Sequence, residues 1–258
     1  MSLGFGRHCA EIVQRAELMR SHIAGADLST AVPTCPGWTL NQLVRHLGGG
    51  LGWAEEIVRD RALQPPSDAH FRDLSRYVGE DPAVLGDWLV TTAGQLDQTL
   101  RAAGPSVRLW TPVTSGYAAF YARRFAHETL IHGADATLAL GRSFAVDDDV
   151  ARDAIDEWLD LVSPPEMREY QPRWREQLGP RRTVALHATD VRADWLVDLS
   201  GGEIVWRHGP ALATVAVAAP VAELLLMIYK RRPTYGDGIE VTGDAGMLDF
   251  WLDRASFG

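Results

Sequence analysis

Glu128 and His132 are the residues whose types and spacing most directly suggest chemistry in this sequence. They lie in the segment from Arg123 to Asp135, whose apolar residues recur as in an amphipathic helix. Residues four apart lie on one helix face, so a carboxylate oxygen and an imidazole nitrogen could reach one metal ion. His127 lies five residues before His132, about 140° around the helix, and should point elsewhere. The spacing favours two metal ligands over a solvated pair only if another segment supplies a third ligand.

Arg124 lies four residues before Glu128 and therefore on the same helix face. Its guanidinium could bind a substrate carboxylate or orient Glu128, whereas an ordinary surface arginine is the simpler interpretation. We treat Arg124 as a candidate catalytic residue.

Four helical segments are predicted in the first part of the chain, at about 7–24, 40–63, 82–104 and from near Ser115 through the Glu–His pair. Thr39 can cap the second segment, and Pro82 suits the first turn of the third. The second segment carries His46 and the triplet Gly48–Gly50, which suggests that another group closely approaches this backbone. An antiparallel bundle, with ligands from facing helices meeting inside it, is the economical architecture.

The composition changes after a further amphipathic segment at 148–162 and a Pro-rich connector that ends at Pro180. Alternating residues predict strands at 183–188, 195–199, 203–207, 211–217 and 239–243, and apolar runs predict helices at 220–229 and 247–252. The sequence therefore predicts two domains, a helical bundle at 1–165 and a small α+β domain at 180–258, with the boundary between about Ser163 and Pro180.

Composition restricts the classes of function. The chain has 258 residues, is 46% hydrophobic and carries a formal net charge of -9, which argues against a nucleic-acid partner. No run approaches the roughly 18 apolar residues of a membrane span, and the N-terminus lacks a signal-peptide core, so we expect a cytoplasmic protein. Cys9 and Cys35 lack the spacing of a zinc site or disulfide framework and are predicted to be small buried side chains.

Three motifs together resemble the mycothiol-dependent maleylpyruvate isomerase family of actinobacteria, within the DinB-like four-helix metalloenzyme superfamily. The first is Val32-Pro33-Thr34-Cys35-Pro36-Gly37-Trp38-Thr39 followed by Leu43-Val44-Arg45-His46-Leu47. The second is His127-Glu128-Thr129-Leu130-Ile131-His132-Gly133-Ala134-Asp135, and the third runs from Ala222-Glu223-Leu224 through Arg231-Arg232-Pro233 to Val241-Thr242-Gly243-Asp244.

This resemblance implies a divalent metal, usually zinc, bound by His46, Glu128 and His132, with mycothiol as a second cofactor. It also implies a DinB-like bundle and a sterol-carrier-like C-terminal domain, from which Arg231 or Arg232 could act as a further catalytic residue. Family members often have Arg-Trp-Asp after the final histidine, whereas this chain has Gly133-Ala134-Asp135. The smaller residues could enlarge the substrate cavity.

Three protein ligands leave a fourth zinc position open, as in catalytic sites, and a thiol bound there would ionise near neutral pH. Addition of that thiolate to a small electrophile makes the protein an isomerase if elimination follows and a thiol S-transferase if it does not. The alternatives are a metal-dependent hydrolase and a non-catalytic, metal-stabilised module that binds an apolar ligand or a protein partner. The expected partners are a small electrophilic substrate and a low-molecular-weight thiol, and no oligomeric state is indicated.

Overall fold

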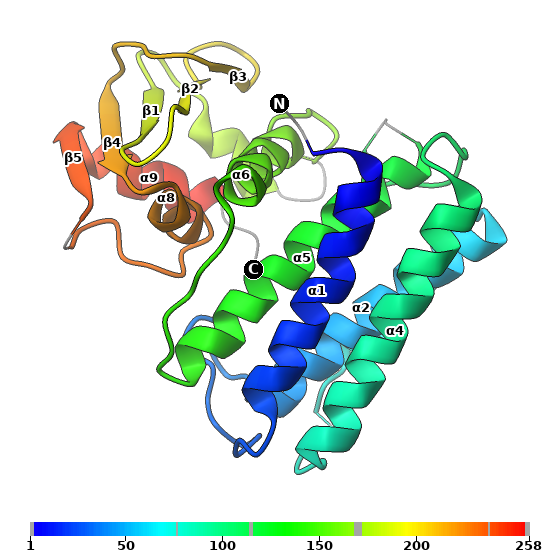
Figure 1. The fold of residues 1–258 in the computed structure, drawn as a ribbon. Helices are drawn as coiled ribbons and strands as arrows, with labels where there is room; N and C mark the ends of the chain where they lie inside the picture. The colour runs from blue at the N-terminus through cyan, green and yellow to red at the C-terminus, as the bar shows by residue number, and fades with distance from the viewer. Residues whose placement is uncertain (1–2, 76, 114–115, 168–171, 237, 256–258) are drawn as a thin grey trace. The chain divides into compact units, whose positions relative to one another are not determined.

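The computed structural model describes residues 3–75, 77–113, 116–167, 172–236 and 238–255. It divides the chain into two compact units, at 3–144 and from 145 onward. The first unit is helical (Figure 1) and contains α1 (Phe5–Ile23), α2 (Leu40–Asp60), α3 (Ala69–Arg72), α4 (Pro82–Ala103) and α5 (Ala118–Ala139). Ser115, where the sequence places the start of the last of these, lies outside the described residues. None of the described helices is long and apolar enough to cross a membrane.

Side-chain caps set where two of these helices begin. Thr39 Oγ1 accepts a hydrogen bond from the backbone N–H of Gln42, whose side chain accepts one in return from the Thr39 N–H. Asp81 accepts hydrogen bonds from the backbone N–H groups of Ala83 and Val84 at the start of α4. Because these caps satisfy N–H groups that have no partner within the helix, α2 and α4 begin where the sequence predicted.

Neighbouring helices α2 and α4 run in the same direction. Gly48 faces Trp88 in the first half of each helix, and Thr99 donates a 2.9 Å hydrogen bond to Glu55 in the second half of each. The expected all-antiparallel arrangement is therefore wrong for this pair. The connection at 61–81 is long enough to return along the bundle, and this allows α4 to start at the same end as α2 (Figure 1).

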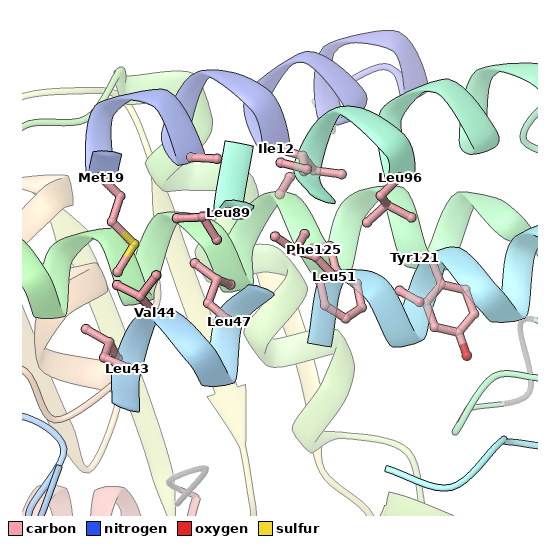
Figure 2. Packing of buried hydrophobic residues seen from close by; sticks show 14 of the residues in the cluster. Ile12, Met19, Leu43, Val44, Leu47, Leu51, Leu89, Leu96, Tyr121 and Phe125 are labelled. Atoms are coloured by element: carbon pink, nitrogen blue, oxygen red, sulfur yellow. The ribbon is translucent and has the colours of Figure 1, made fainter. Parts of the chain in front are cut away.

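The first and last bundle helices, α1 and α5, are also parallel neighbours. The His8 and His127 rings lie 5.8 Å apart in the early turns, and His22 Nδ1 lies 3.0 Å from Thr137 Oγ1 in the late turns. The apolar core of the bundle lies between the helices (Figure 2). It includes Ile12, Met19, Leu43, Val44, Leu47, Leu51, Leu89, Leu96, Tyr121 and Phe125.

The second unit contains α6 (Asp148–Val162), the short helix η1 (Pro172–Gln177), β1 (Thr183–Ala188), β2 (Asp194–Asp198), β3 (Val205–His208), β4 (Val215–Ala219), α8 (Val221–Ile228), β5 (Glu240–Gly243) and α9 (Ala245–Ala255). The strand order is β3-β2-β1-β4-β5; β1 and β4 are parallel and the other neighbours are antiparallel. This mixed sheet with helices is the α+β architecture predicted for the C-terminal region.

Helix α6 is part of this second unit, whereas the sequence-based boundary groups it with the bundle. Its Trp158 is fully buried. The Trp158 ring centroid lies 5.5 Å from that of Trp251 and 6.5 Å from that of Tyr229. Its Asp156 accepts a 2.6 Å hydrogen bond from Trp195 Nε1 on β2. The compact unit thus begins upstream of the Pro-rich connector, because the sheet and α8–α9 need α6 to complete their core.

Candidate active site

Helix α5 brings the Glu128 carboxylate and the His132 imidazole together. His132 Nε2 lies 3.3 Å from Glu128 Oε2, and the side chains are 10% and 32% exposed, respectively. Helical spacing explains the contact, as the sequence indicated. His127 projects from another face of α5, toward His8.

Arg124 binds the other oxygen of Glu128. Its Nε donates a 3.0 Å hydrogen bond to Glu128 Oε1, and its Nη2 also contacts that oxygen. Burial alone would raise the pKa of Glu128, but the charges of Arg124 and His132 and their hydrogen bonds hold the pKa well below its ordinary range. Glu128 is therefore a carboxylate with one oxygen fixed by Arg124 and the other directed at His132.

His46 approaches this pair from α2. Its ring centroid lies 5.3 Å from that of His132, at a nearly perpendicular angle, and its Nδ1 lies 3.4 Å from the Phe71 carbonyl oxygen. The Trp38 ring also packs against the His46 ring, with the two ring centroids 4.8 Å apart. Burial, followed by the charge of His132, lowers the pKa of His46 to about 4. A neutral imidazole with an available nitrogen lone pair is the form that a metal requires.

Asp135, which was not among the site residues predicted from the sequence, contacts His132 at the ring nitrogen that does not face Glu128. His132 Nδ1 lies 3.0 Å from Asp135 Oδ2, Cys35 Sγ lies 3.3 Å from the same oxygen, and Thr34 Oγ1 donates a 2.6 Å hydrogen bond to Oδ1. Burial would lower the pKa of His132, but hydrogen bonds to Asp135, Cys35 and Glu128 raise it well above its usual value. The three-residue spacing from His132 to Asp135 on one helix was the available signal.

The donors at this site suit a divalent metal. Two imidazole nitrogens and one carboxylate oxygen form a donor set of catalytic zinc sites. Ligand atoms about 2.0–2.1 Å from a tetrahedral ion lie roughly 3.3 Å apart. The 3.3 Å between His132 Nε2 and Glu128 Oε2 fits that spacing. Each of the three side chains also has a polar partner away from the shared space, as metal ligands usually do.

A more compact donor cluster in this unit consists of Cys35, His132 and Asp135, whose ligand atoms lie within 4.8 Å of one another. Hydrogen bonds within the cluster already explain this proximity, and Asp135 is fully buried. Asp135 contacts the Nδ1 atom of His132, so the cluster supports the ring and leaves Nε2 facing Glu128. We therefore interpret it as a support for His132 and not as the ion site itself.

Arg231 and Arg232 follow α8 in the C-terminal unit. Arg231 Nη1 donates a 2.7 Å hydrogen bond to the Tyr229 carbonyl, and Arg232 Nε lies 3.4 Å from Glu223 Oε2. These contacts are local to that unit. A catalytic role for either arginine stays a prediction from the sequence.

Comparisons with known proteins cover nearly the whole chain. The family model for the mycothiol maleylpyruvate isomerase N-terminal domain matches residues 9–137, and that for the MDMPI C-terminal domain matches residues 149–250. Among solved structures, mycothiol-dependent maleylpyruvate isomerase and a histidine-to-alanine mutant of it both match with a TM-score of 0.63. The identities are 14% and 13%, over 94% of this chain and 95% of theirs, which establishes a shared fold. No curated protein sequence matches significantly.

Proposed function

This chain belongs to the mycothiol maleylpyruvate isomerase family, and on that premise we propose that it is a metal- and mycothiol-dependent enzyme. It acts on a small electrophilic substrate by thiolate addition, as a cis–trans isomerase or as a thiol S-transferase. The observation that carries the proposal is the convergence of His46 from α2 with Glu128 and His132 from α5.

His46, Glu128 and His132 would each bind the ion through one atom and leave a fourth position for an exogenous ligand. Arg124 keeps Glu128 ionised and directs its second oxygen inward. The Trp38 ring packs against the His46 ring, with the two ring centroids 4.8 Å apart. These roles define a site that is preorganised before any substrate arrives.

The nucleophile is supplied from outside the chain. Burial raises the pKa of the Cys9 thiol to about 11, so it is a poor source of thiolate. Cys35 is engaged with Asp135 at 3.3 Å. His46, Glu128 and His132 would hold the divalent metal, which when bound would lower the pKa of an exogenous thiol and favour its thiolate form.

The substrate decides between the two reactions. A cis double bond conjugated to carbonyl groups, as in maleylpyruvate, can undergo addition, rotation and elimination to the trans isomer with recovery of the thiol. An electrophile that cannot eliminate keeps the new carbon–sulfur bond and leaves as a thioether. In both cases the thiolate sulfur forms a bond to one alkene carbon, and the electrons of the double bond move into the conjugated carbonyl group as an enolate. In the isomerisation these electrons re-form the double bond as the thiolate leaves, whereas in the S-transfer the carbon next to the carbonyl group takes up a proton and the carbon–sulfur bond remains.

The proposal is tested by incubating zinc-loaded protein with maleylpyruvate and a panel of other electrophiles, with and without mycothiol. Proton NMR would follow the alkene signals, and mass spectrometry would detect thioethers. We expect turnover only when zinc and mycothiol are both present. Equal rates without mycothiol would overturn the thiol mechanism in favour of hydrolysis. Stoichiometric zinc without turnover of any electrophile would favour a non-catalytic binding module.

The ligand assignment is tested by measuring zinc per chain in wild type and His46→Ala. We expect stoichiometric zinc in wild type and a clear loss in the variant, because one of three protein ligands is removed. His22→Ala is the matched control, since His22 contacts Thr137 on a different part of the bundle. An unchanged zinc content in His46→Ala would rule out His46 as a ligand.

A further inference from the structure

We propose that Asp135, held by Thr34 and Cys35, is a positioning residue that fixes the His132 ring so that Nε2 faces Glu128. The inference rests on the proposed function for the identity of the ion. The ring geometry itself can be tested without metal.

Hydrogen bonds hold the Asp135 carboxylate in place. It is fully buried, and the side chains that contact it include Thr34 Oγ1 at 2.6 Å, Cys35 Sγ at 3.3 Å and His132 Nδ1 at 3.0 Å. A buried carboxylate is tolerated only where hydrogen bonds replace its water. Thr34 and Cys35 therefore fix the position of the carboxylate, and His132 is the group that it orients.

The two ring nitrogens of His132 have different partners. In a neutral imidazole, one nitrogen carries the proton and donates a hydrogen bond, and the other has the lone pair that can bind a metal. The hydrogen-bond acceptor next to the ring determines which nitrogen carries the proton. With Nδ1 on Asp135, Nε2 is the atom left 3.3 Å from Glu128 Oε2. Without Asp135, the ring could rotate or carry its proton on the wrong nitrogen.

The loop at 32–39, which carries Thr34 and Cys35, is held together by its own backbone hydrogen bonds. Within it, the N–H of Val32 donates to the Trp38 carbonyl at 2.9 Å, the N–H of Cys35 to the Val32 carbonyl at 3.0 Å, and the N–H of Trp38 to the Cys35 carbonyl at 3.0 Å. The loop leads directly into α2, which carries His46. One short segment thus connects the support of His132 on α5 to the helix that presents His46.

The decisive variant is Asp135→Asn, in which the neutral amide is a weaker acceptor and can present N–H groups to His132. We expect zinc affinity, measured by competition with a chromophoric chelator, to fall about 10–100-fold. This is the usual effect of removing a group that hydrogen-bonds to a metal ligand. In metal-free protein labelled with ¹⁵N-histidine, we expect wild type to show an exchange-protected Nδ1–H signal for His132 and Asp135→Asn to lose it.

The two loop residues are tested by paired substitutions. Thr34→Val and Cys35→Ala each remove one donor, so zinc affinity should fall about fivefold, the effect of one ordinary hydrogen bond. Thr34→Ser and Cys35→Ser keep a hydroxyl donor and should recover most of that loss. Cys9→Ala removes a thiol from the bundle core instead and should leave zinc affinity unchanged.

The outcomes separate this inference from the proposed function. If wild type binds no zinc, the proposed function fails, while the Nδ1–H signal still tests the orientation of His132. An identical Nδ1–H signal and zinc affinity in wild type and Asp135→Asn would overturn the inference. If Asp135→Asn does not fold, the loop variants test the inference. It would also be overturned if Thr34→Val and Thr34→Ser had equal zinc affinities and Cys35→Ala and Cys35→Ser did as well.

Discussion

At the scale of single residues, the two oxygens of Glu128 have different tasks. Arg124 contacts Oε1 through two nitrogens, and Oε2 faces His132. A lysine could neutralise the same charge but could not present two N–H groups in a fixed plane. This arrangement supports a role for Arg124 in orienting Glu128, one of the two roles that the sequence left open.

We predict that Arg124→Gln lowers zinc affinity roughly tenfold, because Glu128 loses its fixed orientation. Chelator competition would measure the affinity, and substrate KM would be compared at saturating zinc. Arg123→Gln is the control, since it removes the same charge about 100° away around α5. A raised KM with unchanged zinc affinity would contradict the orienting role and indicate that Arg124 binds a substrate carboxylate.

How far each site residue was predictable depends on how local its contacts are. Glu128 and His132 follow from spacing on one helix, and the structure brings them to 3.3 Å. His46 lies on another helix, so only the family resemblance identified it. The partnership of Asp135 with Cys35 joins residues 100 positions apart, and no local pattern in one sequence encodes it.

At the scale of elements, the parallel packing of α2 and α4 depends on a missing side chain. A Cβ on Gly48 would lie 2.3 Å from Trp88 Cζ3, and one on Gly49 would lie 2.3 Å from Phe71 Cβ. The glycine triplet was expected to mark such a close approach, and Trp88 and Phe71 are the approaching groups.

We predict that Gly48→Ala destabilises the protein by about 1–3 kcal/mol, the usual effect of overpacking, despite the better helix propensity of alanine. Gly94→Ala is the matched control, because Gly94 is in the interior of α4 and a Cβ there would meet nothing within 4 Å. That change should stabilise by up to about 1 kcal/mol. Urea unfolding would measure both, and equal effects of the two substitutions would contradict the packing argument.

Element types were predictable from periodicity, whereas ends and directions depended on partners. Alternation predicted a strand at 211–217, but β4 spans Val215–Ala219, because its pairing with β1 starts at Val184↔Val215. The direction of α4 could not be predicted because the connection at 61–81 has the length for either course.

At the scale of the whole molecule, α6 determines where the C-terminal unit can be cut. Trp158 is fully buried against Trp251 and Tyr229, and Asp156 binds Trp195. Truncation of a buried aromatic residue alone costs about 3–5 kcal/mol, a large part of the stability of a small domain.

We predict that a fragment of residues 145–258 folds cooperatively and that a fragment of residues 180–258, the expected second domain, does not. Circular dichroism during thermal unfolding and the dispersion of amide NMR signals would measure this. Cooperative folding of the shorter fragment, with the same unfolding temperature as the longer one, would contradict a role for α6 and support a boundary at 163–180.

The side-by-side position of α1 and α5 also has a consequence for how the protein is made. Since α5 is the last bundle helix to leave the ribosome, the nascent chain cannot complete its core until more than half of the protein has been synthesised. Glu128 and His132 arrive on that same helix. If His46, Glu128 and His132 hold a metal ion as we propose, a chain that stalls earlier presents His46 alone, and capture of the ion would coincide with closure of the bundle.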